Sequence, residues 1–241
     1  MNDMSTRTSC ETCPIRHRAV CASCDSDELS TLESIKYYRT FQAGQTIVWA
    51  GDRLEFVASL VSGTATIEHL TDDGRKQTLG LLLASDFIGR PGRDTAVYDV
   101  TAVTDVTLCC FRRKQFEDLV RDTPHIAQRM LEMALDELDA ARDWMFLLGR
   151  KTAREKIASL LLLILRRTEA PGIAPATDSR VIELPLTREA MSDYLGLTLE
   201  TVSRQFSKLK ADGVIKLDGK RKVILPDIER LTREAGEADA T

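Results

Sequence analysis

The sequence predicts an α+β fold made of an N-terminal antiparallel β-roll, a long helix and a C-terminal winged helix-turn-helix domain. Short β-rich stretches between residues 37 and 111 are punctuated by glycines, which is typical of antiparallel barrels and sandwiches. Apolar residues then recur with helical spacing from Pro124 onward, as in a long amphipathic helix. Between residues 187 and 225, signals for a helix, a turn, a second helix and a hairpin follow in order.

The composition is that of a folded protein, with 43% hydrophobic and 29% charged residues among 241, which argues against disorder. A net charge of −4 requires any nucleic-acid-binding surface to be local. The longest aliphatic run, Leu160–Leu165, is far shorter than the roughly 20 residues that span a bilayer. Because the chain also shows no secretion signal, we expect a cytoplasmic protein without a membrane partner.

Changes in residue pattern divide the chain into four expected parts. They are a cysteine-rich segment (1–28), the β-roll domain (29–123), a dimerisation helix (124–149) and the winged helix-turn-helix domain (150–241). At the boundary of the first two parts, Asp27 is expected to cap a short helix that runs through Leu29, Leu32 and Ile35. Gly149 marks the expected end of the long helix.

The long helix carries two apolar stripes. The first follows heptad a and d positions and consists of Ala127, Leu131, Ala134, Leu138, Ala141, Met145 and Leu148. The second, on the neighbouring face, consists of Ile126, Met130, Met133, Trp144 and Leu147. Two apolar faces favour one for the protein's own core and one for a second copy, so we expect the first stripe to form a homodimer seam. The pattern also allows the first stripe to pack on the chain's own roll.

The C-terminal part contains the clearest local motif. Thr187 is a good cap for a helix over Arg188–Leu195, and Gly196 supplies the turn to a second helix over Leu199–Ala211. In that second helix the expected buried residues are Val202, Phe206 and Leu209. Asp218-Gly219 then predicts a hairpin, which completes a winged helix-turn-helix.

The residues left exposed on this motif suit DNA. Seven Lys or Arg against three acids lie between residues 197 and 222, a local excess that fits a phosphate-facing surface. The N-terminal half of a recognition helix reads bases, and Arg204 suits a guanine while Glu200 suits a cytosine. The expected DNA-binding residues are Glu200, Thr201, Ser203, Arg204, Lys208, Lys220 and Arg221. A charged helix that binds protein is the competing interpretation.

Six cysteines are distributed unevenly. Cys10, Cys13, Cys21 and Cys24 crowd the N-terminus, whereas Cys109 and Cys110 stand together far away. In a reducing compartment this pattern favours metal binding or redox sensing over disulfides. Strand alternation places Val106, Leu108 and Cys110 on one face and Thr107, Cys109 and Phe111 on the other. The four N-terminal thiols alone also allow a structural zinc site or a thiol–disulfide switch.

Signs of catalysis are missing from the sequence. His17, His69 and His125 are scattered without companions at catalytic spacing, and no phosphate loop, nucleophile elbow or paired-carboxylate motif is present. We therefore do not expect an enzyme.

The run from Glu200 to Arg204, after Leu195-Gly196-Leu197-Thr198, resembles the recognition segment of the CRP/FNR family of bacterial regulators. The order of roll, long helix and winged domain is similar to that family over nearly the whole chain. Its Glu-x-x-Ser-Arg pattern resembles the FNR branch. This resemblance implies a dimer that reads an inverted repeat with TTGAT-like half-sites and works with RNA polymerase.

The resemblance also bears on the ligand. Cys10-x-x-Cys13-x7-Cys21 is similar to the N-terminal segment of FNR-type oxygen sensors, and family alignment makes Cys109 the fourth ligand of a [4Fe–4S] cluster. Cys24 departs from the pattern and is the alternative to Cys21. Arg90 stands where nucleotide-binding members carry a glutamate, so no cyclic nucleotide is expected. The sequence thus predicts an oxygen-responsive regulator, with a zinc site or thiol switch as the alternative.

Overall fold

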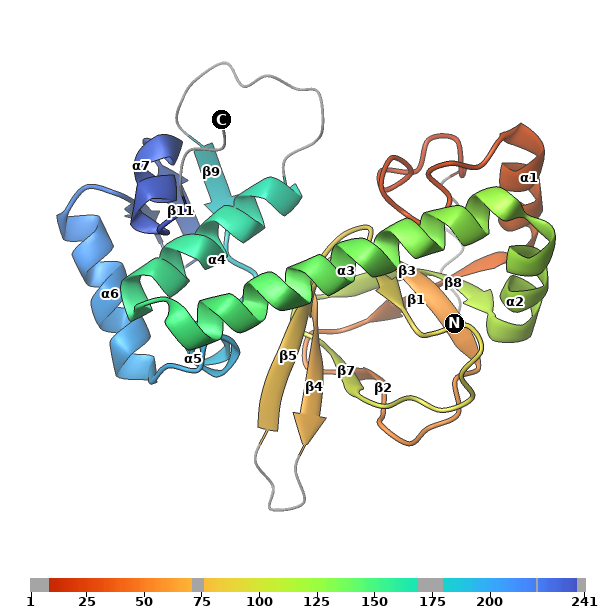
Figure 1. Ribbon diagram of the computed structural model, residues 1–241, viewed down its shortest axis with the longest axis horizontal. Helices are drawn as coiled ribbons and strands as arrows, with labels where there is room; N and C mark the ends of the chain where they lie inside the picture. The colour runs from red at the N-terminus through yellow and green to blue at the C-terminus, as the bar shows by residue number, and fades with distance from the viewer. Residues whose placement is uncertain (1–8, 71–75, 169–179, 220, 238–241) are drawn as a thin grey trace. The chain divides into compact units, whose positions relative to one another are not determined.

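The structure is a computed structural model that describes residues 9–70, 76–168, 180–219 and 221–237. The chain forms two compact units, residues 1–139 and 140–241, and one long helix, α3 (Pro124–Arg150), contributes to both. Figure 1 shows the strands of the first unit in orange and yellow, and the helices of the second in teal and blue.

The first unit contains the predicted β-roll. One sheet has the strand order β1-β8-β3-β6 and the other β2-β7-β4-β5, and every pair is antiparallel. The strands are β1 (Lys36–Phe41), β2 (Thr46–Val48), β3 (Phe56–Ser62), β4 (Ala65–Leu70), β5 (Lys76–Leu82), β6 (Phe87–Ile88), β7 (Asp99–Ala102) and β8 (Val106–Arg112). Gly63 shows why glycines punctuate these strands, because a Cβ there would lie 2.1 Å from the Asp105 carbonyl oxygen.

Strand β8 separates two hydrophobic cores. Val106, Leu108 and Cys110 point into the interior of the roll. On the other face, Cys109 and Phe111 join a second core with residues of the N-terminal segment and the helices. The alternation predicted from the sequence is confirmed, and the two adjacent cysteines lie in different cores.

Helices cover the second core. They are α1 (Ser26–Ile35), α2 (Arg113–Asp122) and the first turns of α3. The cap of α1 is Asp25 and not Asp27 as predicted. The Asp25 carboxylate accepts from the Glu28 amide and the Glu28 carboxylate accepts from the Asp25 amide, which is a capping box. Gly149 does not end α3, which continues to Arg150 before a break at residues 151–152. A glycine lowers helix propensity without stopping a helix.

The two stripes of α3 differ in exposure. In the second stripe Ile126 and Leu147 are buried, Met130 and Met133 pack against the second core, and Trp144 stacks on Tyr194 with ring centroids 4.0 Å apart. In the first stripe Leu131 is 61% exposed, Leu138 45% and Met145 64%, while Leu148 is half-buried. The chain's own cores therefore use the second stripe.

The second unit is a winged helix-turn-helix. Its elements are α4 (Ala153–Thr168), β9 (Arg180–Glu183), α5 (Arg188–Leu195), α6 (Leu199–Ala211), β10 (Lys216–Asp218), β11 (Lys222–Leu225) and α7 (Ile228–Glu234). The bounds of α5 and α6 agree with those predicted, and Val202, Phe206 and Leu209 are the buried residues of α6. Strand β9, which pairs with β11, was not predicted. Within the described ranges, no helix is both long and apolar enough to cross a bilayer.

Candidate cysteine site and DNA-reading surface

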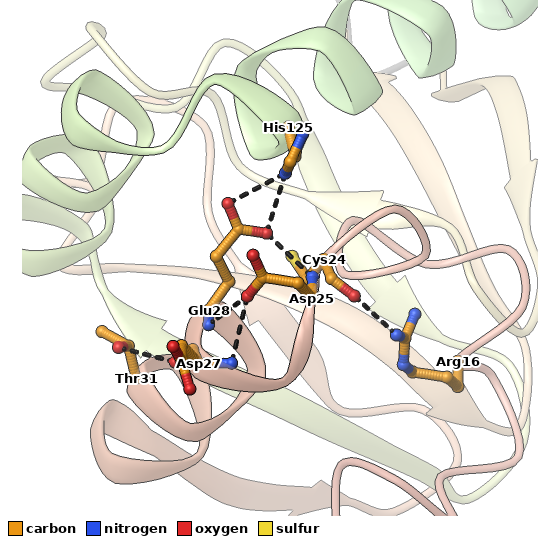
Figure 2. Close-up of polar contacts among 7 residues, drawn as sticks. All are labelled: Arg16, Cys24, Asp25, Asp27, Glu28, Thr31 and His125. Carbon is orange, nitrogen blue, oxygen red and sulfur yellow. Dashed lines mark hydrogen bonds and ion pairs between the residues drawn. The ribbon is translucent and has the colours of Figure 1, made fainter.

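Residues 9–24 form a chain of turns without helix or strand. Arg16 lies at its centre and donates hydrogen bonds to the carbonyl oxygens of Cys21, Ala22 and Cys24 at 2.5, 2.6 and 2.9 Å. Figure 2 shows the last of these bonds, where the segment meets α1. The guanidinium has a fixed fork of donors, so it holds the second pair of N-terminal cysteines in one local conformation.

This segment brings N-terminal thiols to the outer face of β8. Cys10 and Cys24 are buried in the same core as Cys109, and Cys21 packs against it. Cys13 is half-buried, and all six thiols are free. Cys110 lies in the roll interior instead.

The pKa values of the thiols show which sulfurs are neighbours. Burial raises the pKa of Cys109 well above its ordinary value. Cys10, Cys110 and Cys13 raise this pKa further, whereas Lys36 lowers it. Burial also raises the pKa of Cys21 to about 11, with Arg16 opposing and Cys10 and Cys13 contributing. Cys10, Cys13, Cys21 and Cys109 therefore form one electrostatic group.

Cys24 has different neighbours. Its pKa is raised to about 12 by burial first and then by Cys21 and Glu28. Cys24 immediately precedes the Asp25 cap of α1, so its backbone belongs to the start of that helix. Of the two candidates for a third N-terminal ligand, Cys21 is the one in electrostatic contact with both Cys10 and Cys13.

A cation and a carboxylate flank the first thiol. The Lys36 ammonium lies 3.3 Å from the Cys10 sulfur, and the Cys10 amide donates to the Glu33 carboxylate at 3.2 Å. Lys36 is almost fully buried at its side chain. Burial raises the pKa of Cys10, and this ammonium opposes the rise because it favours the thiolate.

Glu28 and His125 form a contact that the sequence did not predict. His125 Nδ1 lies 2.9 and 3.1 Å from the two carboxylate oxygens of Glu28, as Figure 2 shows. The two residues are 97 positions apart, so no local pattern could indicate the pair. Together with Asp25 they place ligand atoms within 4.8 Å of one another, but both carboxylates already serve the capping box. His17 is exposed in its loop.

A second contact joins the cysteine segment to α3. Arg129 donates to the carbonyl oxygen of Arg18 at 2.8 Å and also pairs with Glu132 at 3.0 Å. Together with the His125–Glu28 contact, it fixes the first turns of α3 against residues that flank the thiols. The packing of Ile126 in the core of Cys109 adds an apolar contact.

The roll also contains a pocket on its other side. Its lining includes Arg90, Arg93, Tyr98 and apolar residues of the strands. Arg90, singled out in the sequence, thus lies where the roll is hollow.

The DNA-reading residues lie on one helix and the wing. Glu200, Ser203, Arg204 and Lys208 are exposed on α6, and Thr201 is half-buried. Thr198 caps the helix by accepting from the Thr201 amide. The Arg204 guanidinium lies 3.4 Å from the Thr201 hydroxyl, so it remains on the exposed face near the helix start. Arg221 is exposed on the wing, and Lys220 lies outside the described residues.

Family models match both units of the chain. Residues 38–123 match the cyclic nucleotide-binding domain and residues 155–234 match the Crp-like helix-turn-helix domain. The two matched ranges coincide with the roll and the winged domain described above.

Similar proteins cover nearly the whole chain. The transcriptional activator protein FnrL of Cereibacter sphaeroides is 65% identical over 95% of this chain and 92% of its own length. The nitrogen fixation regulation protein FixK of Bradyrhizobium diazoefficiens is 36% identical over 86% of each chain. The solved structure of FixK2 from Bradyrhizobium japonicum has a TM-score of 0.75 and 30% identity, covering 86% of this chain and all of that one.

Proposed function

Because the chain belongs to the CRP/FNR family of transcription regulators, we propose that it is an oxygen-responsive member that binds a [4Fe–4S] cluster through Cys10, Cys13, Cys21 and Cys109. With the cluster intact, the protein binds an inverted-repeat operator with TTGAT-like half-sites as a homodimer. When oxygen converts the cluster, DNA binding is lost. The proposal places the protein in the cytoplasm, where thiols stay reduced, and in contact with RNA polymerase.

The observation that carries the proposal is the convergence of three N-terminal thiols on Cys109. Cys10 and Cys13 both raise the pKa of Cys21 and of Cys109, and Cys10, Cys21 and Cys109 pack in the core on one face of β8 while Cys110 faces away. Thiolates are the ligands that iron–sulfur clusters prefer. Lys36 at 3.3 Å from the Cys10 sulfur offsets part of the negative charge that four thiolates bring together.

The described cysteines do not form the tight group of sulfurs that a single zinc ion requires. Four thiolates on one zinc lie about 3.8 Å apart, since each Zn–S bond is about 2.3 Å in a tetrahedron. Among the described residues, no three cysteine sulfurs come within 4.8 Å of one another. A cluster spreads its thiolates over separate irons and tolerates a wider arrangement.

Burial also matters for how the ligands ionise. The pKa of Cys21 is about 11, and burial raises that of Cys109 further, so both are neutral thiols near pH 7. Metal ligation requires the thiolate, and loading therefore releases protons. A bound cluster supplies a centre that reacts with dioxygen.

The chain's own residues connect this site to the dimer helix. Arg129 and His125 hold the first turns of α3 against the cysteine segment and α1. The first stripe of α3 is exposed in the single chain, as a seam for a second copy requires. A change in the cysteine segment thereby reaches the helix that would pair the two copies.

DNA recognition is assigned to α6 and the wing. Arg204 is exposed two residues after Val202 and suits a guanine through two hydrogen bonds. Arg90 lines the roll's pocket where family nucleotide binders carry an acid, so the proposal includes no cyclic nucleotide.

Anaerobic purification tests the sensor. We expect about four irons and four sulfides per chain, a broad visible absorbance that air removes, and tighter operator binding before air than after. Cys24→Ser should retain iron and Cys21→Ser should lose it. Zinc without iron would instead support the structural-site alternative and leave the DNA-binding assignment untouched.

A further inference from the structure

Ser59 lies beside Cys109 in the sheet. The register of β3 and β8 places Ser59 opposite Cys109, and the register of β3 and β6 places it opposite Phe87. Tyr38 of β1 is opposite Cys109 on its other side. Residues directly opposite in antiparallel strands project from the same face. The row Tyr38, Cys109, Ser59 and Phe87 therefore faces the cysteine segment.

The hydroxyl of Ser59 has no hydrogen-bond partner among the described residues, although the side chain is only 2% exposed. A buried, unpaired hydroxyl destabilises a folded protein, since it has lost its bonds to water. Its cross-strand neighbour Phe87 offers no strong acceptor, and its other cross-strand neighbour is Cys109. A thiol is a weak acceptor, whereas a thiolate is a strong one.

The opposite face of the same two strands provides a contrast. There Cys110 is paired with Ala58, and both are fully buried in the roll interior. A small apolar residue thus suffices beside the cysteine that faces away from the site. A hydroxyl occupies the equivalent position beside the cysteine that faces it.

We propose that Ser59 is a positioning residue for the metal site, whose hydroxyl donates a hydrogen bond to the Cys109 thiolate once that sulfur is a ligand. The proposal rests on the assignment of Cys109 as a cluster ligand. It explains why an unpaired hydroxyl occupies this buried position, because its acceptor exists only in the loaded protein. Outer hydrogen bonds of this kind tune ligand strength and metal retention.

The test compares Ser59→Ala, Ser59→Thr and wild type in the full chain. Under nitrogen, with a competing iron chelator, Ser59→Ala should lose iron roughly tenfold faster, while Ser59→Thr keeps the hydroxyl and stays near wild type. Ser62→Ala, an exposed hydroxyl on the same strand, is the matched control. The iron–sulfur(Cys) stretching bands in resonance Raman spectra should shift in Ser59→Ala and not in Ser62→Ala.

Thermal unfolding of the cluster-free proteins separates this role from packing. Ser59→Ala should unfold at the same temperature as wild type or a higher one, because the unpaired hydroxyl is gone. Equal iron loss in wild type and Ser59→Ala would overturn the proposal, as would a Ser59→Ala variant that is less stable without the cluster. A wild-type protein that takes up no iron would instead overturn the proposed function, and the role of Ser59 with it.

Discussion

In the C-terminal unit, the chain's own side chains complete the structure that reads DNA. Thr187 and Thr198 cap α5 and α6, and Arg154 bonds Glu234 and Asp212 at 2.6 and 2.7 Å. The N-terminal segment of residues 9–24 has no helix or strand. Burial raises the pKa of its Cys21 to about 11, and the buried hydroxyl of Ser59, opposite Cys109, has no partner among the described residues. The C-terminal unit is held by contacts among its own side chains, whereas under the proposed function the N-terminal unit depends on a bound cluster.

The largest expected effect is a difference in iron retention between substitutions of the two adjacent cysteines, Cys109 and Cys110. Cys109→Ser should reduce iron retention by far more than the roughly 10–100-fold that loss of an outer hydrogen bond causes, because it removes a ligand. Cys110→Ser should retain iron, since its side chain faces the roll interior. Iron and sulfide assays on both anaerobic proteins measure this difference. Equal loss in the two variants would mean that β8 does not present Cys109 to the site.

A charge in the first stripe of α3 should abolish pairing of the two copies. Leu138→Asp places an unpaired carboxylate in the proposed seam at a cost of about 3–5 kcal/mol, so the variant should be monomeric and fail to bind the operator. Gln128→Asp, which puts the same charge on α3 outside the stripe, should remain dimeric.

Sedimentation velocity reports the state of both variants. It also tests a related expectation, that cluster-free wild type stays substantially dimeric at micromolar concentration, because the a and d positions carry no charge. A monomeric Leu138→Asp protein that still bound the operator would contradict the seam.

Alanine substitutions of two arginines in the DNA-reading unit should change DNA binding in different ways. Arg204→Ala should weaken operator binding by about 1–3 kcal/mol and relax preference at one base pair per half-site. Arg221→Ala on the wing should weaken binding to all sequences alike and flatten its salt dependence. Fluorescence anisotropy with operator and random duplexes distinguishes the two. Uniform loss in both variants would remove α6 from the role of recognition helix.

The smallest expected effect is the contribution of the Arg154–Glu234 pair to the stability of the C-terminal unit. The hydrogen bond from Arg154 holds the pKa of Glu234 below its ordinary 4.5, so this pair contributes stability above pH 4.5 that is lost as the pH falls further. Arg154→Ala should cost about 1 kcal/mol at pH 7, and this difference should shrink below pH 4.5.

Trp144, stacked on Tyr194, provides the signal for that measurement. In a Trp49→Phe background its fluorescence reports unfolding of the C-terminal unit alone, because the chain has two tryptophans. If the difference in unfolding free energy between wild type and Arg154→Ala did not change with pH, the low pKa of Glu234 would not be caused by Arg154.

Local signals explain what could be predicted from the sequence. Caps and turns such as Thr187, Thr198 and Gly196 act within one helical turn, so the bounds of α5 and α6 agree with the pattern. Alternation along β8 likewise requires only neighbouring residues, and it separated Cys109 from Cys110. The choice of Asp27 over Asp25 failed because both residues are good caps, and the capping box with Glu28 decides between them.

Contacts between distant segments explain the rest. The His125–Glu28 contact and the Arg129–Arg18 bond join residues far apart in sequence, and nothing in either segment indicates the other. Strand β9 has four residues and derives its order from pairing with β11. No sequence pattern indicates Ser59, because its proposed role depends on two structural facts. It lies opposite Cys109 in the sheet, and its buried hydroxyl has no partner among the described residues.

The bond from Arg129 to Arg18 joins α3 to the cysteine segment. Two binding equilibria that share an element are coupled, and each ligand changes the affinity for the other by the same factor. Under the proposed function, an operator that holds α3 in the paired arrangement also tightens the hold of the cysteine segment on iron. Copies bound to DNA would then hold iron with higher affinity than free copies. As oxygen lowers the concentration of loaded protein, the weakest operators would be vacated first and the strongest last, so a single regulator would switch off its genes in order of affinity.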